Sequence, residues 1–209
     1  MTSDLEKRIR MVYPTGMLNN PNKTKLLGKK FEKQVFDAIH EISESTSAVC
    51  VPFPHWWDVS MTHQFHFTLD GPRYDNFIDN TEIISWMRDN PRDYAVLCLN
   101  ISKVYPAYEF CFLIWEYMDN LDYVEMSIST GLFNPSWAPF FQETIVRLKQ
   151  RGIIQLKEHE LEEEVPFVMS EDDESIDDES LILVPATVHK CLFEEFYWDD
   201  TLQDTGDSA

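Results

Sequence analysis

The stretch from Val104 to Thr130 constrains the fold of this chain more than any other. Within it, Tyr108 to Tyr117 is the longest nearly continuous run of aromatic and β-branched residues, which is typical of a central strand. Asp119-Asn120 predicts a two-residue turn, and Leu121 to Ile128 then alternates apolar and polar residues. We therefore predict a β-hairpin around which the other elements are arranged.

A two-residue turn also sets the register of this hairpin, because strand pairing begins next to the turn. The predicted pairs on the core face are Trp115 with Val124, Leu113 with Met126 and Cys111 with Ile128. The opposite face carries Phe110, Phe112 and Ile114, and either the chain's own helices or a partner protein covers it. Coverage by the chain itself is favoured, since monomers rarely tolerate such an exposed apolar patch.

The rest of the chain alternates between helical and strand patterns. Helices are predicted at 24–44, 81–90, 137–151 and 186–198, and strands at 48–53, 61–69, 94–101, 153–156 and 181–184. The alternation in 61–69 predicts a half-buried strand. The order of elements predicts an α+β fold, with helices packed against a mostly antiparallel β-sheet in a single domain with an acidic C-terminal segment.

Five segments follow from this pattern. They are an N-terminal arm (1–23), an α+β core (24–157), an acidic loop (158–180), a C-terminal strand and helix packing on the core (181–200), and a disordered tail (201–209).

Charge is the strongest global signal, with 37 acidic and 17 basic residues and a formal net charge of −20. The distribution is uneven: residues 1–33 carry +5, residues 34–157 carry −8 and residues 158–209 carry −17. Such a field repels nucleic acids and anionic membranes, whereas it attracts basic proteins. We expect a basic protein as partner, and neither nucleic acid nor membrane.

The four cysteines, Cys50, Cys98, Cys111 and Cys191, show no paired spacing, which indicates reduced and mostly buried thiols. The longest uninterrupted apolar run, Phe110 to Trp115, is far too short to span a membrane. The N-terminus lacks the apolar centre of a signal peptide. We expect a cytoplasmic protein; the sequence indicates no oligomeric state.

No motif in the sequence indicates a cofactor, a metal site or catalysis. The six glycines are isolated, so no phosphate-binding loop is present. His66-Phe67-Thr68 resembles one half of the arrangement in two-histidine phosphoesterases, but no second His-x-Thr or His-x-Ser unit exists. A small hydrolase or phosphodiesterase that uses His66 with neighbouring His55, His63, Asp58 and Asp70 is one alternative function.

The favoured hypothesis is a non-catalytic acidic binding protein that neutralises a basic protein partner. Bacterial immunity proteins, which block a toxin's active cleft, are small, cytoplasmic and often acidic, so an immunity-type toxin inhibitor is the analogy at the level of class. The predicted partner-binding residues are Trp56, Trp57, Asp58, Glu162, Glu163, Glu164, Asp172, Asp173, Asp177 and Asp178. The aromatic pair would anchor the partner, although two tryptophans packing at a corner are the simpler interpretation.

A second alternative is a phage-type mimic of nucleic acid that inhibits a defence or regulatory enzyme. In a mimic, carboxylates imitate phosphates, so they must be held at regular spacing on ordered elements. Residues 158–179 have the composition of a flexible segment, which disfavours this alternative.

Overall fold

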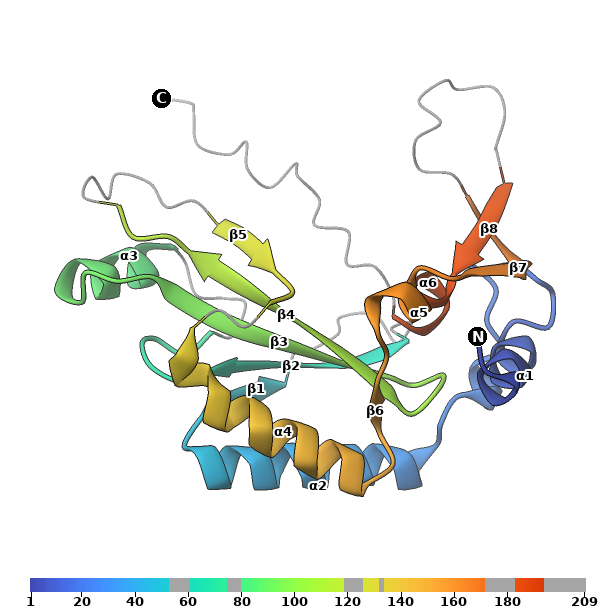
Figure 1. Cartoon of the computed structure of the whole chain (residues 1–209), viewed down its shortest axis with the longest axis horizontal. Coiled ribbons are helices and arrows are strands. Elements are labelled where there is room, and N and C mark those ends of the chain that lie inside the picture. The colour runs from blue at the N-terminus through green and yellow to red at the C-terminus, as the bar shows by residue number, and fades with distance from the viewer. Residues whose placement is uncertain (53–60, 75–79, 119–125, 132–133, 172–182, 194–209) are drawn as a thin grey trace.

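The computed structural model describes residues 1–52, 61–74, 80–118, 126–131, 134–171 and 183–193. Their larger sheet follows the order β1-β2-β3-β4-β5, with all neighbours antiparallel, and β6 pairs parallel to β4 (Figure 1). The strands are β1 (Val49–Pro52), β2 (Thr62–Thr68), β3 (Tyr94–Ser102), β4 (Ala107–Trp115), β5 (Met126–Ser129) and β6 (Ile154–Gln155). The predicted α+β class is confirmed.

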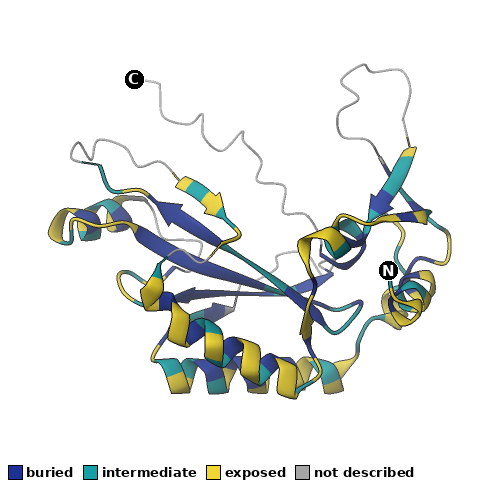
Figure 2. Ribbon diagram, viewed as in Figure 1, coloured by how far each residue is buried: buried dark blue, intermediate teal, exposed yellow. Residues whose placement is uncertain are grey.

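Helices cover both faces of this sheet. Helices α2 (Lys29–Thr46) and α4 (Ala138–Gln150) lie side by side on one face, and α3 (Asn80–Asp89) packs on the other (Figure 1). Glu41 of α2 accepts hydrogen bonds from Arg147 (3.2 Å) and Arg151 (2.7 Å) of α4, which ties the two helices together. Figure 2 shows that α2 and α4 turn their buried residues toward the sheet and their exposed residues toward solvent.

The face of β4 that carries Phe110, Phe112 and Ile114 is covered by the chain itself, as favoured from the sequence. Phe112 has no exposed surface, and its ring packs against Trp137 (5.1 Å between centroids) and Phe141 (5.9 Å). This face is the main core. The opposite face, with Leu113 and Trp115, is also buried, under α3.

The strand at 62–68 is not half-buried as predicted. Its residues are buried on both faces, except for His63. Polar residues such as Thr62 and His66 lie under other parts of the chain, so alternation in sequence did not indicate exposure.

The predicted register of the hairpin is wrong by two residues. Trp115 pairs with Met126, and Leu113 pairs with Ile128. Strand pairing ends at Trp115, and beyond it the backbone N–H of Tyr117 donates to the Asp93 carboxylate (2.8 Å), so the connection is longer than a two-residue turn allows. A shift of two keeps each side chain on its predicted face. The predicted turn at 119–120 and Val124 lie outside the described residues.

A second cluster of elements packs at the end of the sheet (Figure 1). It contains α1 (Ser3–Val12), α5 (Glu158–Leu161), β7 (Glu164–Glu171), β8 (Leu183–Thr187) and α6 (Val188–Leu192). The N-terminal arm thus contains a helix, α1, that buries Leu5, Ile9 and Val12 in this cluster. Strand β8 pairs with β7 and not with the larger sheet.

Two helix boundaries differ from the prediction by more than two residues. Helix α2 begins at Lys29 and not at residue 24, because Leu26 is extended and the N–H of Leu27 donates to Lys103 O (2.7 Å). A short 3₁₀ helix, Lys23–Lys25, precedes it. Helix α6 ends at Leu192, since Phe193 is extended; residues 194–209, including the predicted tail, lie outside the described residues.

The packing of Phe112 predicts that Phe112→Ala lowers the free energy of unfolding by about 3–5 kcal/mol, because it leaves a cavity between β4 and α4. Ile128→Ala on the neighbouring strand is the control, since that side chain is 55% exposed and its loss should change stability by no more than about 0.5 kcal/mol. Urea unfolding of both variants measures the difference, and equal losses would contradict the assignment of the main core.

Candidate functional site

The described part of the predicted partner-binding set is Glu162, Glu163 and Glu164. Glu162 ends α5, and Glu164 begins β7, so the three carboxylates lie at the junction of these elements. All three residues are exposed. The remaining predicted residues, Trp56, Trp57, Asp58, Asp172, Asp173, Asp177 and Asp178, lie outside the described residues.

This acidic junction is a short connection between two ordered elements, because Glu162 and Glu163 lie between α5 and β7 and Glu164 is the first residue of β7. The predicted acidic loop, 158–180, contains α5 and β7, and residues 172–180 lie outside the described residues. The carboxylate of Glu160 accepts the backbone N–H of Lys157 (2.9 Å), which caps the first turn of α5. Val165 and Val168 of β7 are fully buried in the second cluster.

The N-terminal segment holds β7 in place. Met169 N–H donates to Gly16 O (2.8 Å), and Leu18 N–H donates to Met169 O (2.9 Å), which forms a short parallel bridge. The Arg10 guanidinium lies 3.5 Å from the centre of the Phe167 ring. The Glu163 carboxylate binds the N-terminal ammonium of Met1. Segments far apart in the sequence therefore fix the acidic junction.

The charge of this surface is left largely uncompensated. Within the described ranges, no Lys or Arg side chain forms an ion pair with Glu158, Glu162 or Glu164. Exposed carboxylates without counter-charges leave a negative potential that extends about one Debye length, roughly 8–10 Å at moderate salt. Such a surface is able to attract a cationic patch.

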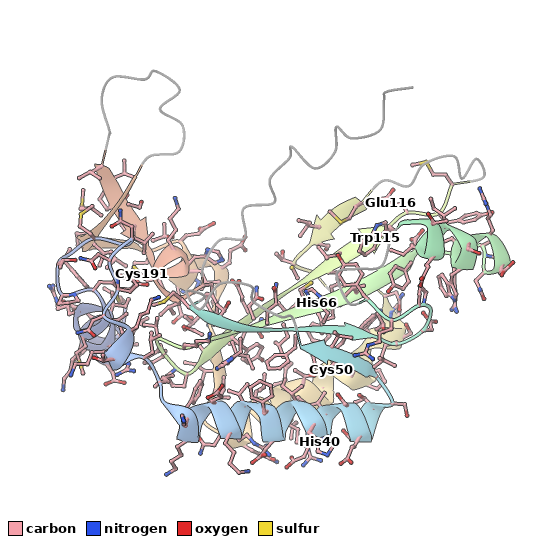
Figure 3. The ribbon with its side chains drawn as sticks, turned by 180° about the vertical axis from the view of Figure 1, so that it is seen from behind. His40, Cys50, His66, Trp115, Glu116 and Cys191 are labelled. Carbon is pink, nitrogen blue, oxygen red and sulfur yellow. The ribbon has the colours of Figure 1, made fainter. Side chains whose placement is uncertain are left out.

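The histidines of the hydrolase alternative are not brought together. His66 is 2% exposed, and its ring packs against Tyr74 on the face away from α2 and α4 (5.2 Å between centroids; Figure 3). His63 lies on the opposite face, with its ring near Phe36 (5.7 Å). Asp70 forms an exposed ion pair with Arg92 (2.8 Å). His55 and Asp58 lie outside the described residues.

The structure also reveals a polar row that the sequence analysis missed. Gln64, Asn100 and Glu109 are directly opposed on β2, β3 and β4. Glu109 accepts a hydrogen bond from Asn100 (3.0 Å) and pairs with His189 of α6 (2.9 Å). Gln64 Oε1 and Asn100 Oδ1 are buried, and among the described residues neither has a hydrogen-bond partner.

Next to this row, Cys98 of β3 lies directly opposite Cys111 of β4. Neither thiol is in a disulfide, and the two side chains lie on the same face of the sheet as directly opposed residues. In the sequence, the alternation along β4 places Glu109 and Cys111 on the same face of the strand. The pairing of Cys111 with Cys98 follows only from the register between β3 and β4.

Two observations on the described residues, and comparisons with known proteins, bear on other classes of function. No group of three or more His, Cys, Asp or Glu side chains is placed to hold a metal ion there. None of its helices combines the length and apolar character needed to cross a bilayer. Comparisons with protein-family models, curated proteins and solved structures found no match to this chain.

The contact between Gly16 and β7 is testable by a matched pair of substitutions. Gly16 has φ of 71°, and a Cβ there would lie 2.9 Å from Phe167 O. Gly152 also has φ of 71°, but a Cβ there would meet no atom within 4 Å. Gly16→Ala should therefore lower the free energy of unfolding by about 1–3 kcal/mol more than Gly152→Ala does. Both variants place an alanine at a positive φ, but only Gly16→Ala adds a steric clash.

Hydrogen exchange of the backbone amides shows which part of the chain Gly16→Ala destabilises. We expect the amides of 164–171 to exchange faster in Gly16→Ala and at the wild-type rate in Gly152→Ala. Equal protection of this strand in both variants would show that the N-terminal segment does not hold the acidic junction.

Proposed function

We propose that this protein is a non-catalytic acidic binding protein that neutralises a basic protein partner, as an immunity-type inhibitor of a bacterial toxin does. The observation that supports it is the acidic junction: Glu162, Glu163 and Glu164 are exposed on an ordered framework, with little compensating positive charge. Residues 158–209 carry a net charge of −17, which extends the same field along the chain.

The physical role of this charge is to speed association and to select a partner by sign. A cationic protein that approaches the junction gains long-range attraction before contact, so its association rate rises above that of a neutral pair. Ordered carboxylates also lose less conformational entropy on binding than flexible ones. The proposal places the protein in the cytoplasm and requires no cofactor.

The nucleic-acid mimic is the second candidate, and one specific observation favours it. The prediction disfavoured a mimic because residues 158–179 were expected to be flexible, but Glu158–Leu161 is helical and Glu164–Glu171 is a strand. The condition of ordered carboxylates is therefore met for part of the run. For the hydrolase alternative, the described histidines lie on opposite faces of β2, which supplies no such support.

Charge reversal tests the proposed surface. The triple variant Glu162→Lys, Glu163→Lys and Glu164→Lys should slow association with the basic partner at least ~10-fold at low salt. Its stability should change by no more than about 1 kcal/mol, the loss of the ion pair between Glu163 and Met1 included, since exposed acids and exposed ion pairs contribute little to folding. The partner to use is a basic protein that copurifies with the wild-type chain, and stopped-flow mixing measures the rate.

The matched control reverses three exposed acids elsewhere, Glu32, Glu82 and Asp89 on α2 and α3. Both triple variants change the net charge by the same amount. A difference between their association rates therefore reports where the reversed charges lie, and not the total charge. An equal loss in both triples, or an association rate that does not fall between about 0.05 and 0.5 M salt, would contradict the proposed surface. Competition by duplex DNA would favour the mimic over the immunity-type inhibitor.

A further inference from the structure

Two thiols face each other in the middle of the larger sheet. Cys98 and Cys111 are a directly opposed pair in the antiparallel ladder of β3 and β4. Opposed residues in such a ladder have Cα atoms about 4.5 or 5.5 Å apart, and both values fall within the range that a disulfide spans. Directly opposed residues in an antiparallel ladder project their side chains on the same face of the sheet, so the two thiols are neighbours. Closing a bond between them requires no change of register.

The two thiols differ in access and in acidity. Cys98 is 2% exposed, whereas Cys111 is half-buried. The neighbouring Cys98 thiol lowers the pKa of the Cys111 thiol, although burial and the nearby Glu109 carboxylate oppose this effect. The neighbouring Cys111 thiol, together with burial, raises the pKa of Cys98. Cys111 is therefore the thiol that ionises first and that a reagent reaches first.

The position of Cys111 along β4 explains its access. Strand β5 pairs with residues 112–115 of β4, and β6 pairs with Ala107 and Tyr108. In the described ladder, Glu109 to Cys111 lie between these two partners, so no strand residue is opposed to Cys111 on that side. Cys98, by contrast, has His66 of β2 opposite it on its other side.

We propose that Cys98 and Cys111 form a reactive dithiol, which exchanges with a small disulfide of the glutathione type and closes into a disulfide across β3 and β4. The site is independent of the acidic junction, and it adds a redox modification to a protein whose proposed function is binding. The order of reaction follows from the geometry, with Cys111 as the attacking thiol and Cys98 as the resolving one.

The exchange balances in two steps. The Cys111 thiolate attacks one sulfur of the small disulfide, an S–S bond forms to Cys111, and one small thiolate leaves. The Cys98 thiol then loses its proton and attacks the Cys111 sulfur, so that the intramolecular S–S bond forms and the second small thiolate leaves. The pair loses two electrons and two protons, and the small disulfide is reduced to two thiols.

Cys50 and Cys191 are internal controls for this chemistry. Cys50 is half-buried like Cys111, but burial raises its pKa to about 12. Cys191 lies in the second cluster (Figure 3). Burial raises its pKa to about 12 as well. At neutral pH, the lower pKa of Cys111 gives it a larger thiolate fraction than Cys50, so Cys111 should react faster than Cys50 with the same reagent.

The test treats the reduced full-length chain with oxidised glutathione and follows it by intact-mass and peptide-mass spectrometry. We expect the wild-type chain to lose the mass of two hydrogen atoms, with the link between the peptides of Cys98 and Cys111. Cys98→Ser should accumulate one glutathione adduct on Cys111, because the resolving thiol is gone. Cys111→Ser should react no faster than Cys50 does in the wild type.

The result that would overturn the proposal is a wild-type chain that forms no 98–111 link, or a Cys98→Ser variant that forms no adduct on Cys111. Adducts on Cys50 at a rate equal to that on Cys111 would also overturn it. Circular dichroism of the serine variants at native temperature confirms that each is folded, and iodoacetamide labelling of the wild type between about pH 6 and 9 gives an independent measure of which thiol ionises first.

Discussion

The arrangement of the molecule depends on the hydrogen bonds that the turn between β3 and β4 forms with distant segments. Its backbone carbonyls accept hydrogen bonds from three separate segments: Lys103 O from Leu27 N (2.7 Å), Val104 O from Arg8 Nε (2.7 Å) and Pro106 O from Ile154 N (3.0 Å). Buried backbone acceptors must be satisfied, and here the N-terminal helix, the entry to α2 and strand β6 satisfy them. The turn therefore joins the sheet to the second cluster.

The sheet supplies the rigid part of this arrangement. Strand β3 is buried on both faces, with Leu97 and Leu99 toward α2 and α4 and with Val96 and Cys98 toward α3. A strand that is buried on both sides gains most from its apolar residues and has little freedom to slip in register. The same fixed register places Cys98 opposite Cys111 and Asn100 opposite Glu109, so the packing of the core sets the positions of these side chains.

The second cluster gives the acidic segment an order that its composition alone would not support. Many like charges favour an extended and solvated chain. In β7, buried Val165 and Val168 and the bridge to Gly16 offset that repulsion, while Glu162 and Glu164 stay in solvent. Charge at the surface and apolar anchoring beneath it are compatible because the exposed acids, Glu162 and Glu164, lie directly before the buried Val165 in the chain. This combination is what a binding surface for a basic partner requires.

The sequence by itself determined the fold class, the positions of most strands and the concentration of negative charge after residue 158, because hydrophobic periodicity and charge are local properties. It placed Phe110, Phe112 and Ile114 on one face of β4 correctly, although the hairpin register was two residues off. Only the tertiary structure decided that β2 is buried on both faces, that β8 pairs with β7, and that Cys98 meets Cys111. Those outcomes depend on which distant segments pack together, and pairing energies between strands are not encoded in the pattern of any one strand.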